Sequence, residues 1–389
     1  MSESGIDKIG FATTSLFLDM RDLAESRGVD PEKFTVGIGQ KEQSIAPSSQ
    51  DSVTLAAAAA KDALEGEDLG KIDMILLGTE SGVDASRAGA IYVKQLLGLP
   101  DRIRCVELKQ ACYGGTAALS WALDYVSRRP GRKVLAIGSD VARYGLNTPG
   151  EVTQGAGAVA MLCSSDPKIL KVEEDGEFLT DFAADFWRPT YSNCAIVDGH
   201  YSTEVYLEFF SRLWEKYKKK TGREAKDFEA FLFHLPFAKM GLKALKEVLK
   251  EADPAHAEKL RSRFEASAAY GRRVGNIYSA SLYLALLSLL ESTPLSPGSK
   301  IALFSYGSGA EAELFSAEIQ EGYSAHLSAA KHLSEINGRK KVGVKEYEHI
   351  FSDFLPANPE DYSCEERYFA GPFRLTGTRG QQRQYEAEK

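Results

Sequence analysis

The stretch "ELKQACYGGTAALSWALDYV", residues 107–126, joins a cysteine to the start of an apolar helical pattern. Apolar side chains occupy nearly every side of the predicted helix, which is typical of a helix buried in a protein core. Cys112 stands at its beginning, with Ala111 before it and Gly114 and Gly115 after it. We therefore expect a buried helix whose N-terminus carries a thiol among small residues.

A second stretch of the same character, "GNIYSASLYLALLSLLES", covers residues 275–292. Each of the two helical stretches lies between two strand-like apolar runs. These runs are "IDMILLGTE" (72–80), "KVLAIGSD" (133–140), "FEAFLFHLP" (228–236) and "KIALFSYGSG" (300–309). A repeated strand–helix–strand order of this length predicts an α/β protein made of two duplicated half-domains. We place the halves at residues 1–166 and 167–389, with the join in a turn-like stretch near residues 162–170.

The composition excludes several classes of protein. The 389 residues carry a net charge of -8, and the pI is near 5.5, so nothing indicates nucleic-acid binding. No apolar run approaches the roughly 20 residues of a membrane span, and the start "MSESGIDKIG" lacks the order of a signal peptide. We expect a cytoplasmic protein that contacts no membrane. The last dozen residues are polar, and we expect them to be poorly ordered.

The cysteines and histidines point to neither a disulfide framework nor a metal site. Five cysteines, an odd number, show no C-x-x-C spacing, and six scattered histidines show no H-E-x-x-H arrangement. We therefore predict free thiols and no metal ion.

The repeat has a geometric consequence for function. If both halves pack about a pseudo-twofold axis, strand C-termini and helix N-termini from the two halves converge, and α/β proteins bind ligands at such places. Glu80 and His234 come near the ends of strands, and Cys112 and Asn276 come at the starts of helices. These four residues are the candidates for a shared site.

Cys112 has two interpretations. A helix N-terminus favours the thiolate, which is the nucleophilic form, and the small neighbours leave room for an acyl group. A buried structural cysteine is the commoner fate of a lone cysteine in an intracellular protein. The local sequence leaves both open.

The other three candidates are also ambiguous. His234 interrupts an apolar strand, so it either lines a cavity or is a core histidine bonded to backbone. Glu80 is either a general base with a raised pKa or a solvated loop residue. Asn276 either caps its helix or directs its amide into the site.

Four lysines follow His234 at helical spacing, in "PFAKMGLKALKEVLK" (236–250). Lysines at this position can meet the phosphates of a nucleotide-containing substrate. For Lys246 and Lys250 we favour a solvated helix face, whereas Lys239 and Lys243 remain candidates for phosphate binding.

Taken together, the motifs closely resemble the 3-hydroxy-3-methylglutaryl-CoA (HMG-CoA) synthase family, in its bacterial mevalonate-pathway form. The resemblance runs from the N-terminus to about residue 315, with the motifs in the family's order. They are "GTESG", "ACYGGTAA", "YGLNTPGEVTQGAGAVAML", "DFWRP", "VDGHYS", "FHLPFAKMGLKAL", "GNIYSASLYLALLSLL" and "LFSYGSGAEAELF". The resemblance implies a thiolase-like fold with two pseudo-twofold-related βαβαβ halves in a five-layered αβαβα arrangement, usually a homodimer.

The resemblance also implies a mechanism. Cys112 takes an acetyl group from acetyl-CoA, Glu80 removes a proton from the acetyl methyl, and the carbon attacks C3 of acetoacetyl-CoA. His234 and Asn276 hold this second substrate, and water releases HMG-CoA from Cys112. No cofactor is expected, because the CoA thioesters are themselves the substrates.

Matching the family position by position implicates further residues. The oxyanion donors are expected at the Cys112 backbone N–H and in the turn with Gly307 and Ser308. The remaining expected substrate contacts are Asn147, Thr153, Ser202, Lys239 and Lys243, with Asp30 and Lys33 near the adenine of CoA. Tyr144, Asp140 and Asp185 are expected to orient these groups or to line the site. Pro31 departs from the family pattern, which puts a backbone N–H contact to CoA at that position in doubt.

Three alternatives share the predicted fold. A ketoacyl synthase III-like enzyme or a thiolase does not need a glutamate at the position of Glu80. A β-branching synthase of polyketide assembly performs the same condensation on an acceptor bound to a carrier protein. The third alternative is a non-catalytic protein that binds acyl-CoA or a partner, and it has no need of Cys112, Glu80, His234 and Asn276 together.

Overall fold

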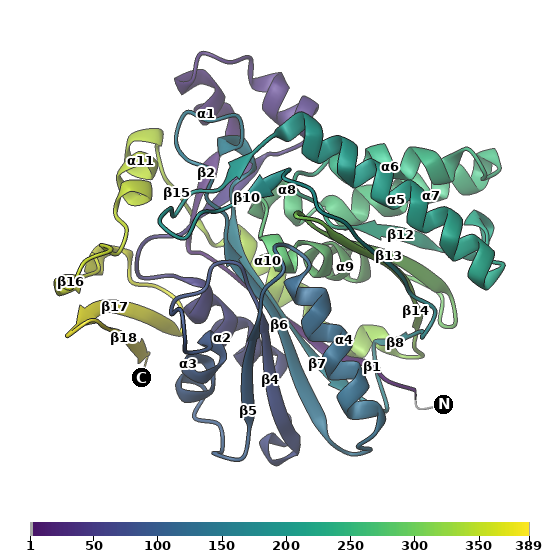
Figure 1. Ribbon diagram of the computed structural model, residues 1–389, viewed down its shortest axis with the longest axis horizontal. Coiled ribbons are helices and arrows are strands. Elements are labelled where there is room, and N and C mark those ends of the chain that lie inside the picture. The colour runs from purple at the N-terminus through teal and green to yellow at the C-terminus, as the bar shows by residue number, and fades with distance from the viewer. Residues whose placement is uncertain (1–2, 389) are drawn as a thin grey trace.

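One mixed sheet runs through the molecule in the computed structural model, which describes residues 3–388 (Figure 1). Its strands follow the order β12-β13-β14-β8-β1-β7-β6-β4-β5, and β9 pairs with β14 beside this path. The first five in the chain are β1 (Gly5–Thr13), β4 (Ile72–Gly78), β5 (Arg104–Leu108), β6 (Lys133–Val141) and β7 (Ala156–Ser164). The other five are β8 (Leu170–Val172), β9 (Glu177–Thr180), β12 (Ala230–Phe233), β13 (Lys300–Gly307) and β14 (Glu311–Ile319).

The two parts of this sheet repeat one topology. In the first part, β4 is parallel to β6, β6 is antiparallel to β7, and β7 is antiparallel to β1. In the second part, β12, β13, β14 and β8 are paired in the same sequence of directions. The two parts meet where β1 pairs with β8. This duplication confirms the predicted α/β fold of two related halves, seen in Figure 1 as blue strands and green strands.

Alternating side chains on the strands separate the interior into layers. Leu76 of β4 and Leu232 of β12 both belong to a central core that also contains α4 (Gly114–Ser127) and α9 (Ser281–Ser292). Their neighbours point the other way, because successive strand residues face opposite sides of a sheet. Ile75 packs with α2 (Ser52–Ala63) and α3 (Gly89–Leu96).

Phe231, on the second half-sheet, packs under an outer layer of its own. That layer consists of α5 (Gly199–Thr221), α6 (Met240–Leu249) and α7 (Pro254–Ala268). The order is therefore helices, sheet, central helices, sheet, helices, as the five-layered thiolase-like arrangement requires.

Shorter elements surround these layers. They are β2 (Leu16–Asp19), α1 (Met20–Ser26), the π-helical turn η1 (Lys33–Ile38), β3 (Glu42–Ile45), β10 (Phe186–Trp187), β11 (Ile196–Val197), α8 (Gly271–Val274) and the 3₁₀ turn η5 (Tyr278–Ala280). No helix within residues 3–388 is long and apolar enough to cross a membrane.

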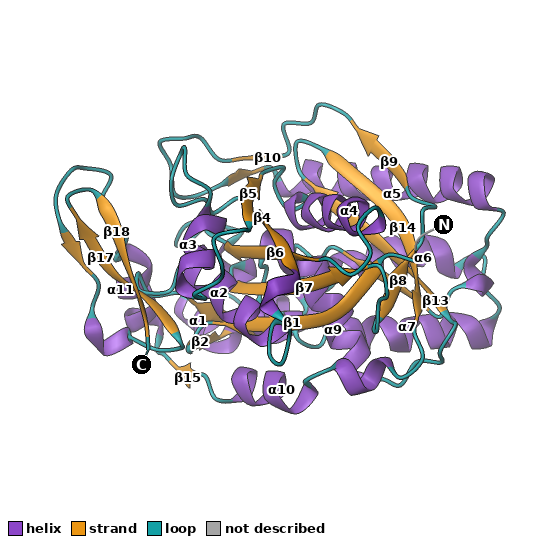
Figure 2. Ribbon diagram, turned by 90° about the horizontal axis from the view of Figure 1, so that it is seen from below, coloured by secondary structure: helices purple, strands orange, loops and turns teal. Residues whose placement is uncertain are grey.

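The chain after β14 returns to the first half. It forms α10 (Ala329–Asn337), β15 (Lys340–Lys341), α11 (Val344–Ser352), β16 (Tyr362–Ser363), β17 (Phe373–Arg379) and β18 (Gln382–Ala387). β15 pairs with β2, and the hairpin of β17 and β18 lies at the same end of the molecule as α3 (Figure 2). The expectation of poor order for the last dozen residues is wrong, because β18 pairs with β17 and Tyr385 donates to Asp51 at 2.6 Å. The division at residues 166 and 167 falls between β7 and β8 and stays a prediction.

A buried histidine attaches α10 to both halves. The His332 ring is fully buried, and its two nitrogens lie 2.7 Å from Asp62 of α2 and 2.7 Å from Glu291 of α9. Burial opposes the charged ring, but the two carboxylates outweigh it and raise the pKa of His332 to about 9. Lys331 also pairs with Asp62, so the cluster holds charges of both signs. We infer that a buried imidazolium holds the C-terminal segment in place.

Replacing this imidazolium is expected to loosen the fold. His332→Gln leaves buried Glu291 without its cation and Asp62 with Lys331 alone, and removing one partner of a buried pair costs about 3–5 kcal/mol. We expect Tm to fall by several degrees at pH 6. Because the folded pKa lies above the unfolded value, the stabilisation is complete below about pH 6.5 and is lost as pH rises through about 9.

Thermal unfolding between pH 6 and 10 checks this expectation, with His349→Gln as the control. His349 pairs with Glu365 at the surface, where ion pairs contribute little. A constant difference in Tm between His332→Gln and the unsubstituted protein across this range would contradict the charged-histidine assignment.

Candidate active site

The thiol and the carboxyl group predicted to work together are in contact. Glu80 follows the end of β4, and Cys112 comes just before α4. The Cys112 Sγ donates to Glu80 Oε1 at 3.4 Å. Glu80 is buried and Cys112 is partly exposed, so the pair lies just beneath the surface. A reactive group that approaches the sulfur also approaches the carboxyl group.

Burial sets the protonation of both groups. Burial, with a smaller contribution from the nearby Asp140, raises the pKa of Glu80 to about 8, although Arg188 opposes this. It also raises the pKa of the Cys112 thiol well above its ordinary value, and the Glu80 charge adds to this effect. The expectation that a helix N-terminus favours the thiolate is therefore wrong for the resting site. Cys112 precedes the first helical residue, Gly114, by two positions, and desolvation outweighs the dipole.

The chain turns sharply to present Cys112. Ala111 has a φ of 43°, in the left-handed region that residues with a Cβ atom rarely adopt. The Tyr113 N–H donates to the Gln110 carbonyl at 2.9 Å and closes the turn. A Cβ atom added at Gly78, at the end of β4, would lie 2.2 Å from the Gly114 carbonyl oxygen. Small residues are thus required for β4 and α4 to bring Glu80 and Cys112 together.

Asp140, at the end of β6, connects the two halves beneath this pair. Its carboxylate accepts hydrogen bonds from the Glu80 N–H and the Ser81 N–H at 2.9 Å each. It also accepts from the Ser279 N–H of the second half at 3.0 Å. Asp140 therefore positions Glu80, as the sequence predicts, and it does so by binding backbone groups on both sides of the pseudo-twofold axis.

Asn276 does not occupy the N-cap position of η5 or α9, which is held by Ile277 and Ala280, but it bonds to residues of both. Its Oδ1 accepts from the Tyr278 N–H and from the Ser281 hydroxyl at 2.9 Å each. Its Nδ2 donates to the Tyr144 hydroxyl at 3.2 Å, on the side of the Cys112–Glu80 pair. The Thr153 carbonyl accepts from the Asn276 N–H at 3.0 Å. The two bonds to its Oδ1 fix the side chain so that its amide nitrogen points to Tyr144.

Asn147 lies in the loop between Tyr144 and Thr153. It has a φ of 57°, and its N–H donates to Glu151 at 2.9 Å. This places three predicted contact residues, Tyr144, Asn147 and Thr153, in one segment beside Asn276.

His234 directly follows β12 and is 2% exposed. Its backbone is fully bonded: the N–H donates to Phe304, and the carbonyl accepts from the Tyr206 hydroxyl, both at 2.8 Å. The ring is different, because its Nδ1 is buried and has no hydrogen-bond partner among residues 3–388. Burial lowers the pKa of His234 to about 3, so the ring is neutral. A core histidine bonded to backbone is therefore not what the structure contains.

Asp185 holds the turn that carries the predicted oxyanion donors. This buried carboxylate accepts from the Tyr306 hydroxyl at 2.9 Å and from the Gly309 N–H at 3.0 Å, on either side of Gly307 and Ser308. A Cβ atom at Gly307 would lie 2.6 Å from the Gln110 carbonyl oxygen, so the turn reaches the chain just before Cys112. The two halves thus bring both predicted oxyanion donors together.

Ser202, predicted as a substrate contact, donates to this same Asp185 at 2.9 Å. Its hydroxyl therefore orients the carboxylate, and its contact with substrate stays a prediction.

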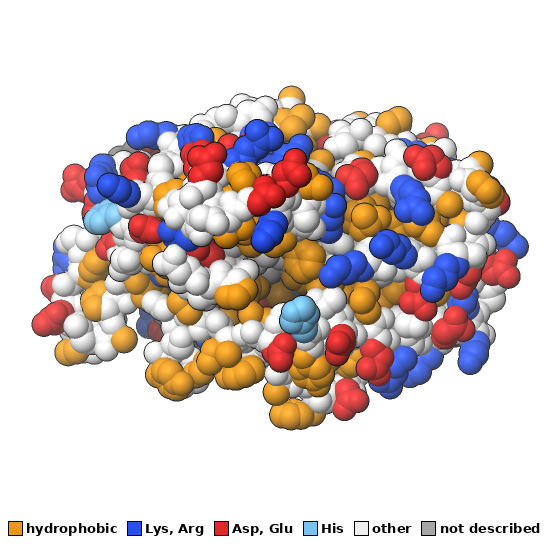
Figure 3. Space-filling view, turned by 90° about the horizontal axis from the view of Figure 1, so that it is seen from above, with side chains coloured by type: hydrophobic (Ala, Val, Ile, Leu, Met, Phe, Trp, Pro, Cys, Tyr) orange, Lys and Arg blue, Asp and Glu red, His pale blue; other side chains and the backbone are white. Residues whose placement is uncertain are grey.

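The predicted CoA-binding residues form a separate group. The Lys239 N–H donates to the Ile38 carbonyl at 3.2 Å, so the segment with Asp30 and Lys33 lies beside Lys239. The Lys243 Nζ lies 5.5 Å from the centre of the Phe237 ring. Seen from above the view of Figure 1, the surface is hollowed near its centre, with Lys and Arg side chains beside the hollow (Figure 3).

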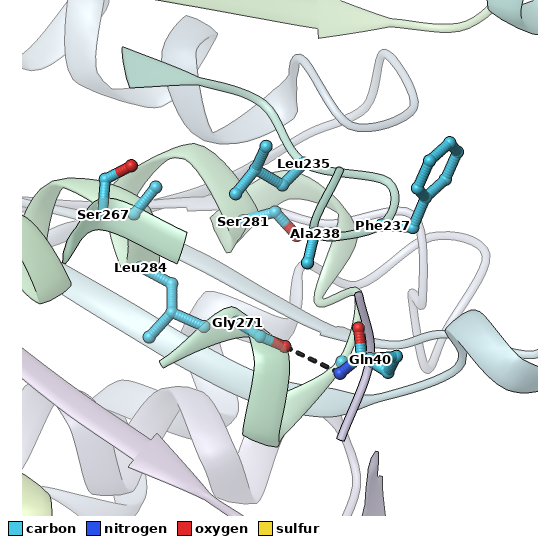
Figure 4. A pocket seen from close by; sticks show the side chains of 10 residues that line it. Gln40, Leu235, Phe237, Ala238, Ser267, Gly271, Ser281 and Leu284 are labelled. Atoms are coloured by element: carbon cyan, nitrogen blue, oxygen red, sulfur yellow. Dashed lines mark hydrogen bonds between the residues drawn. The ribbon is translucent and has the colours of Figure 1, made fainter. Parts of the chain in front are cut away.

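The loop between His234 and Lys239 packs over a small pocket. Figure 4 shows a pocket where Leu235 and Ala238 lie near Ser281 of α9. Gln40 Nε2 donates there to the Gly271 carbonyl at 2.8 Å. The loop that starts at the catalytic histidine candidate and ends at the lysines is therefore supported by both halves.

Four residues of the site were not assigned from the sequence: Arg188, Tyr278, Ser279 and Tyr306. The charge of Arg188 lowers the pKa of Glu80, and the Tyr306 hydroxyl donates to Asp185. Arg188 lies in the quoted motif "DFWRP" and Tyr306 in "LFSYGSG", but only the tertiary contacts give them a place. Within the described part of the chain, no cluster of three or more His, Cys, Asp or Glu side chains has the arrangement of a metal site.

Comparison with known proteins places these residues in a family. The family model for the N-terminal part of hydroxymethylglutaryl-coenzyme A synthase matches residues 2–168, and the model for the C-terminal part matches residues 176–253 and 245–354. The chain is 47% identical over 352 residues to a hydroxymethylglutaryl-CoA synthase of Enterococcus faecalis, covering 90% of this chain and 92% of that protein.

Two solved structures agree with this. A structure of HMG-CoA synthase complexed with CoA has a TM-score of 0.96 and 45% identity, covering 99% of this chain and 100% of that one. A structure of MvaS in complex with 3-hydroxy-3-methylglutaryl coenzyme A has a TM-score of 0.90 and 35% identity, covering all of both chains. With the Cys112–Glu80 pair and the duplicated fold, these matches show that the chain belongs to the hydroxymethylglutaryl-CoA synthase family.

Proposed function

We propose that the protein condenses acetyl-CoA with acetoacetyl-CoA and water, giving HMG-CoA and CoA through an acetyl group on Cys112. The observation that carries this proposal is the 3.4 Å contact between the Cys112 sulfur and the Glu80 carboxyl group. A condensing enzyme needs a nucleophile for the first acyl group and a base for the methyl next to its carbonyl. One contact supplies both.

In the first step Cys112 becomes acetylated. The Cys112 thiol loses its proton as the sulfur attacks the thioester carbonyl of acetyl-CoA. The carbon–sulfur bond to CoA breaks, and the CoA sulfur takes up a proton and leaves as a thiol. The Cys112 and Ser308 N–H groups stabilise the oxyanion that forms in this step.

In the second step the new carbon–carbon bond forms. The Glu80 carboxylate removes a proton from the methyl of acetyl-Cys112, and the resulting carbanion equivalent attacks C3 of acetoacetyl-CoA. The C3 oxygen receives the proton that Glu80 removed. His234 is neutral, so its ring donates a hydrogen bond to that oxygen without an unpaired buried charge.

Water then cleaves the remaining thioester bond to Cys112, which frees the HMG carboxylate and restores the thiol.

The binding residues divide along the length of the CoA thioester. Lys239 and Lys243 contact its phosphates, and Asp30 and Lys33 lie near its adenine. Asn276, Tyr144, Asn147 and Thr153 hold the acyl end, and Ser202 and Asp185 support the oxyanion turn. No cofactor takes part in this scheme. The cytoplasmic location expected from the sequence stays a prediction.

We also propose that two copies form a homodimer. β5 lies at the edge of the sheet, with its outer side unpaired by any of the described strands. In the second half of the chain, residues 178–201 expose several aromatic side chains, including Phe182 and Tyr191, each 89% exposed. Unpaired strand edges and exposed apolar side chains are features that protein interfaces cover.

Two substitutions separate the chemical steps. Cys112→Ser is expected to abolish CoA release from acetyl-CoA plus acetoacetyl-CoA and to leave no acetyl group on the protein. Glu80→Gln is expected to retain an acetyl group on Cys112 but to lower condensation by about 100-fold or more, as loss of a general base does. Mass spectrometry of the intact protein and a CoA-release assay measure the two steps, with Glu335→Gln and Cys105→Ser as controls. Equal loss of both steps in Glu80→Gln, or an undiminished rate in Cys112→Ser, contradicts the assigned roles.

The pH profile of condensation follows from the raised pKa of Glu80. The base must be deprotonated, and its pKa is about 8. Starting from acetyl-Cys112, in which the thiol cannot titrate, we expect the condensation rate to rise about tenfold per pH unit below pH 8 and to level off above it. Rapid-quench measurements from pH 6 to 9 test this. Glu335→Gln, which removes another buried carboxyl group with a raised pKa, is expected to leave the profile unchanged. A flat profile from pH 6 to 8 excludes Glu80 as the titrating base.

Light scattering measures the oligomeric state. We expect a mass of twice the chain's 42.6 kDa. The double substitution Phe182→Ser and Tyr191→Ser changes two solvent-exposed side chains, so the monomer fold is retained, and a shift toward the monomer mass is expected. A monomeric unsubstituted protein contradicts the proposal, and an unaltered dimer places the contact at β5 instead.

A further inference from the structure

One buried hydroxyl in the site has no role in the scheme above. The Tyr278 side chain is 1% exposed, and its hydroxyl has no hydrogen-bond partner among residues 3–388. Across this part of the chain, only three other buried side-chain atoms lack a partner. They are one guanidinium nitrogen each of Arg132 and Arg143, and Nδ1 of His234. The two such atoms in the site thus belong to Tyr278 and to His234, which is proposed to bind the second substrate.

The backbone around Tyr278 is held in an unfavourable conformation. Its φ is 43°, which costs free energy for a residue with a large side chain. The hydrogen bond from its N–H to Asn276 Oδ1 holds it on one side, and the bond from the Ser279 N–H to Asp140 holds it on the other. Both partners are site residues. Such strain persists only where the surroundings impose it, and here it directs the ring of Tyr278.

That ring lies in a wall of three aromatic side chains. The ring centres of Tyr278 and Tyr144 are 5.9 Å apart, and those of Tyr278 and Phe186 are also 5.9 Å apart, both in edge-to-face geometry. The Tyr144 hydroxyl accepts from Asn276, and the Tyr278 hydroxyl lies near it without the geometry of a hydrogen bond. Burial raises the pKa of Tyr278 well above its ordinary value, and Tyr144, Glu80 and Cys112 add to this effect, so its hydroxyl stays protonated and acts as a donor.

The condensation leaves one oxygen that needs another donor. The acetyl carbonyl oxygen is served by two backbone N–H groups, but the C3 oxygen of acetoacetyl-CoA becomes an alkoxide as the new bond forms. Neutral His234 offers it a single N–H at most, and no full positive charge. Glu80 acts on the carbon that bonds to C3, so C3 and its oxygen lie beside Glu80 in that step, where the Tyr278 hydroxyl is also found.

We propose that the Tyr278 hydroxyl donates a hydrogen bond to the C3 oxygen of acetoacetyl-CoA and stabilises the alkoxide formed during condensation. This rests on the proposed function and adds a catalytic residue to it. In the resting enzyme the hydroxyl is unpaired because its acceptor is part of the substrate. Acetylation of Cys112 and hydrolysis of acetyl-Cys112 involve no C3 oxygen, so Tyr278 has no part in them.

The test uses Tyr278→Phe, which keeps the ring and removes only the hydroxyl. We expect condensation of acetyl-Cys112 with acetoacetyl-CoA to slow by about 10- to 100-fold, as loss of a charge-assisted hydrogen bond does. Acetylation by acetyl-CoA and acetate release without acceptor are expected to stay within about twofold of the unsubstituted enzyme. Tm is expected not to fall, since replacing an unpaired buried hydroxyl by hydrogen is neutral or stabilising.

Tyr283→Phe is the matched control. Tyr283 is equally buried and five residues further along the chain, but its hydroxyl is bonded to Thr116 at 2.7 Å. We expect this variant to lose stability and to keep its condensation rate.

A full condensation rate in Tyr278→Phe overturns the inference, and so does an equal loss of acetylation and condensation with a lowered Tm. If the unsubstituted protein is not acetylated, the proposed function itself fails. If it condenses normally and Tyr278→Phe matches it, only this inference fails.

Discussion

The start of α4 lies directly against Ser279, and β6 lies directly against Ala280; the position of the reactive groups depends on these contacts. A Cβ atom at Gly115 would lie 2.2 Å from the Ser279 carbonyl oxygen, and one at Gly138 would lie 2.9 Å from the Ala280 Cα. The Ser279 hydroxyl donates to the Gly78 carbonyl at 2.8 Å, and its N–H donates to Asp140. Two helix starts from opposite halves are thereby held together at the pseudo-twofold axis, and each carries a residue of the site beside it.

This arrangement explains why the reactive pair is neutral at rest. Two half-sheets and two central helices exclude water from Glu80, and a desolvated carboxyl group keeps its proton to a higher pH. The same desolvation keeps Cys112 as a thiol. Groups that are neutral at rest leave no lasting buried charge, so the site carries charge only while bonds form. His234, neutral for the same reason, belongs to this pattern.

The C-terminal segment shows how the outer parts support the core. It leaves the second half after β14, yet it adds a strand beside β2 and places His332 between Asp62 and Glu291. Those carboxylates come from helices of opposite halves. The segment thus connects the halves at a distance from the reactive pair. Its charged contacts are buried, so removing one charge leaves its partner buried without a counter-charge.

The duplicated order of strands and helices was readable from the sequence, because strand-like apolar runs, buried helical runs and glycines are local properties of the chain. They also placed Glu80, Cys112, His234 and Asn276 at strand and helix ends. The role of each residue does not follow from its neighbours in the sequence. The thiol was expected to ionise at a helix start, but tertiary burial and Glu80 decide otherwise.

The bond from Ser202 to Asp185 was not foreseen, and its contact with substrate stays a prediction. Tyr278, Ser279 and Tyr306 had no recognisable signal, because their partners lie more than a hundred residues away or are missing until substrate binds. The polar C-terminus was expected to be poorly ordered, but β18 pairs with β17 and Tyr385 bonds to Asp51, contacts that its composition does not reveal. The sequence by itself determined the fold and where the reactive residues stand along it. Only the tertiary structure decided their protonation, their partners and the unpaired groups that await substrate, since these depend on which side chains exclude water around them.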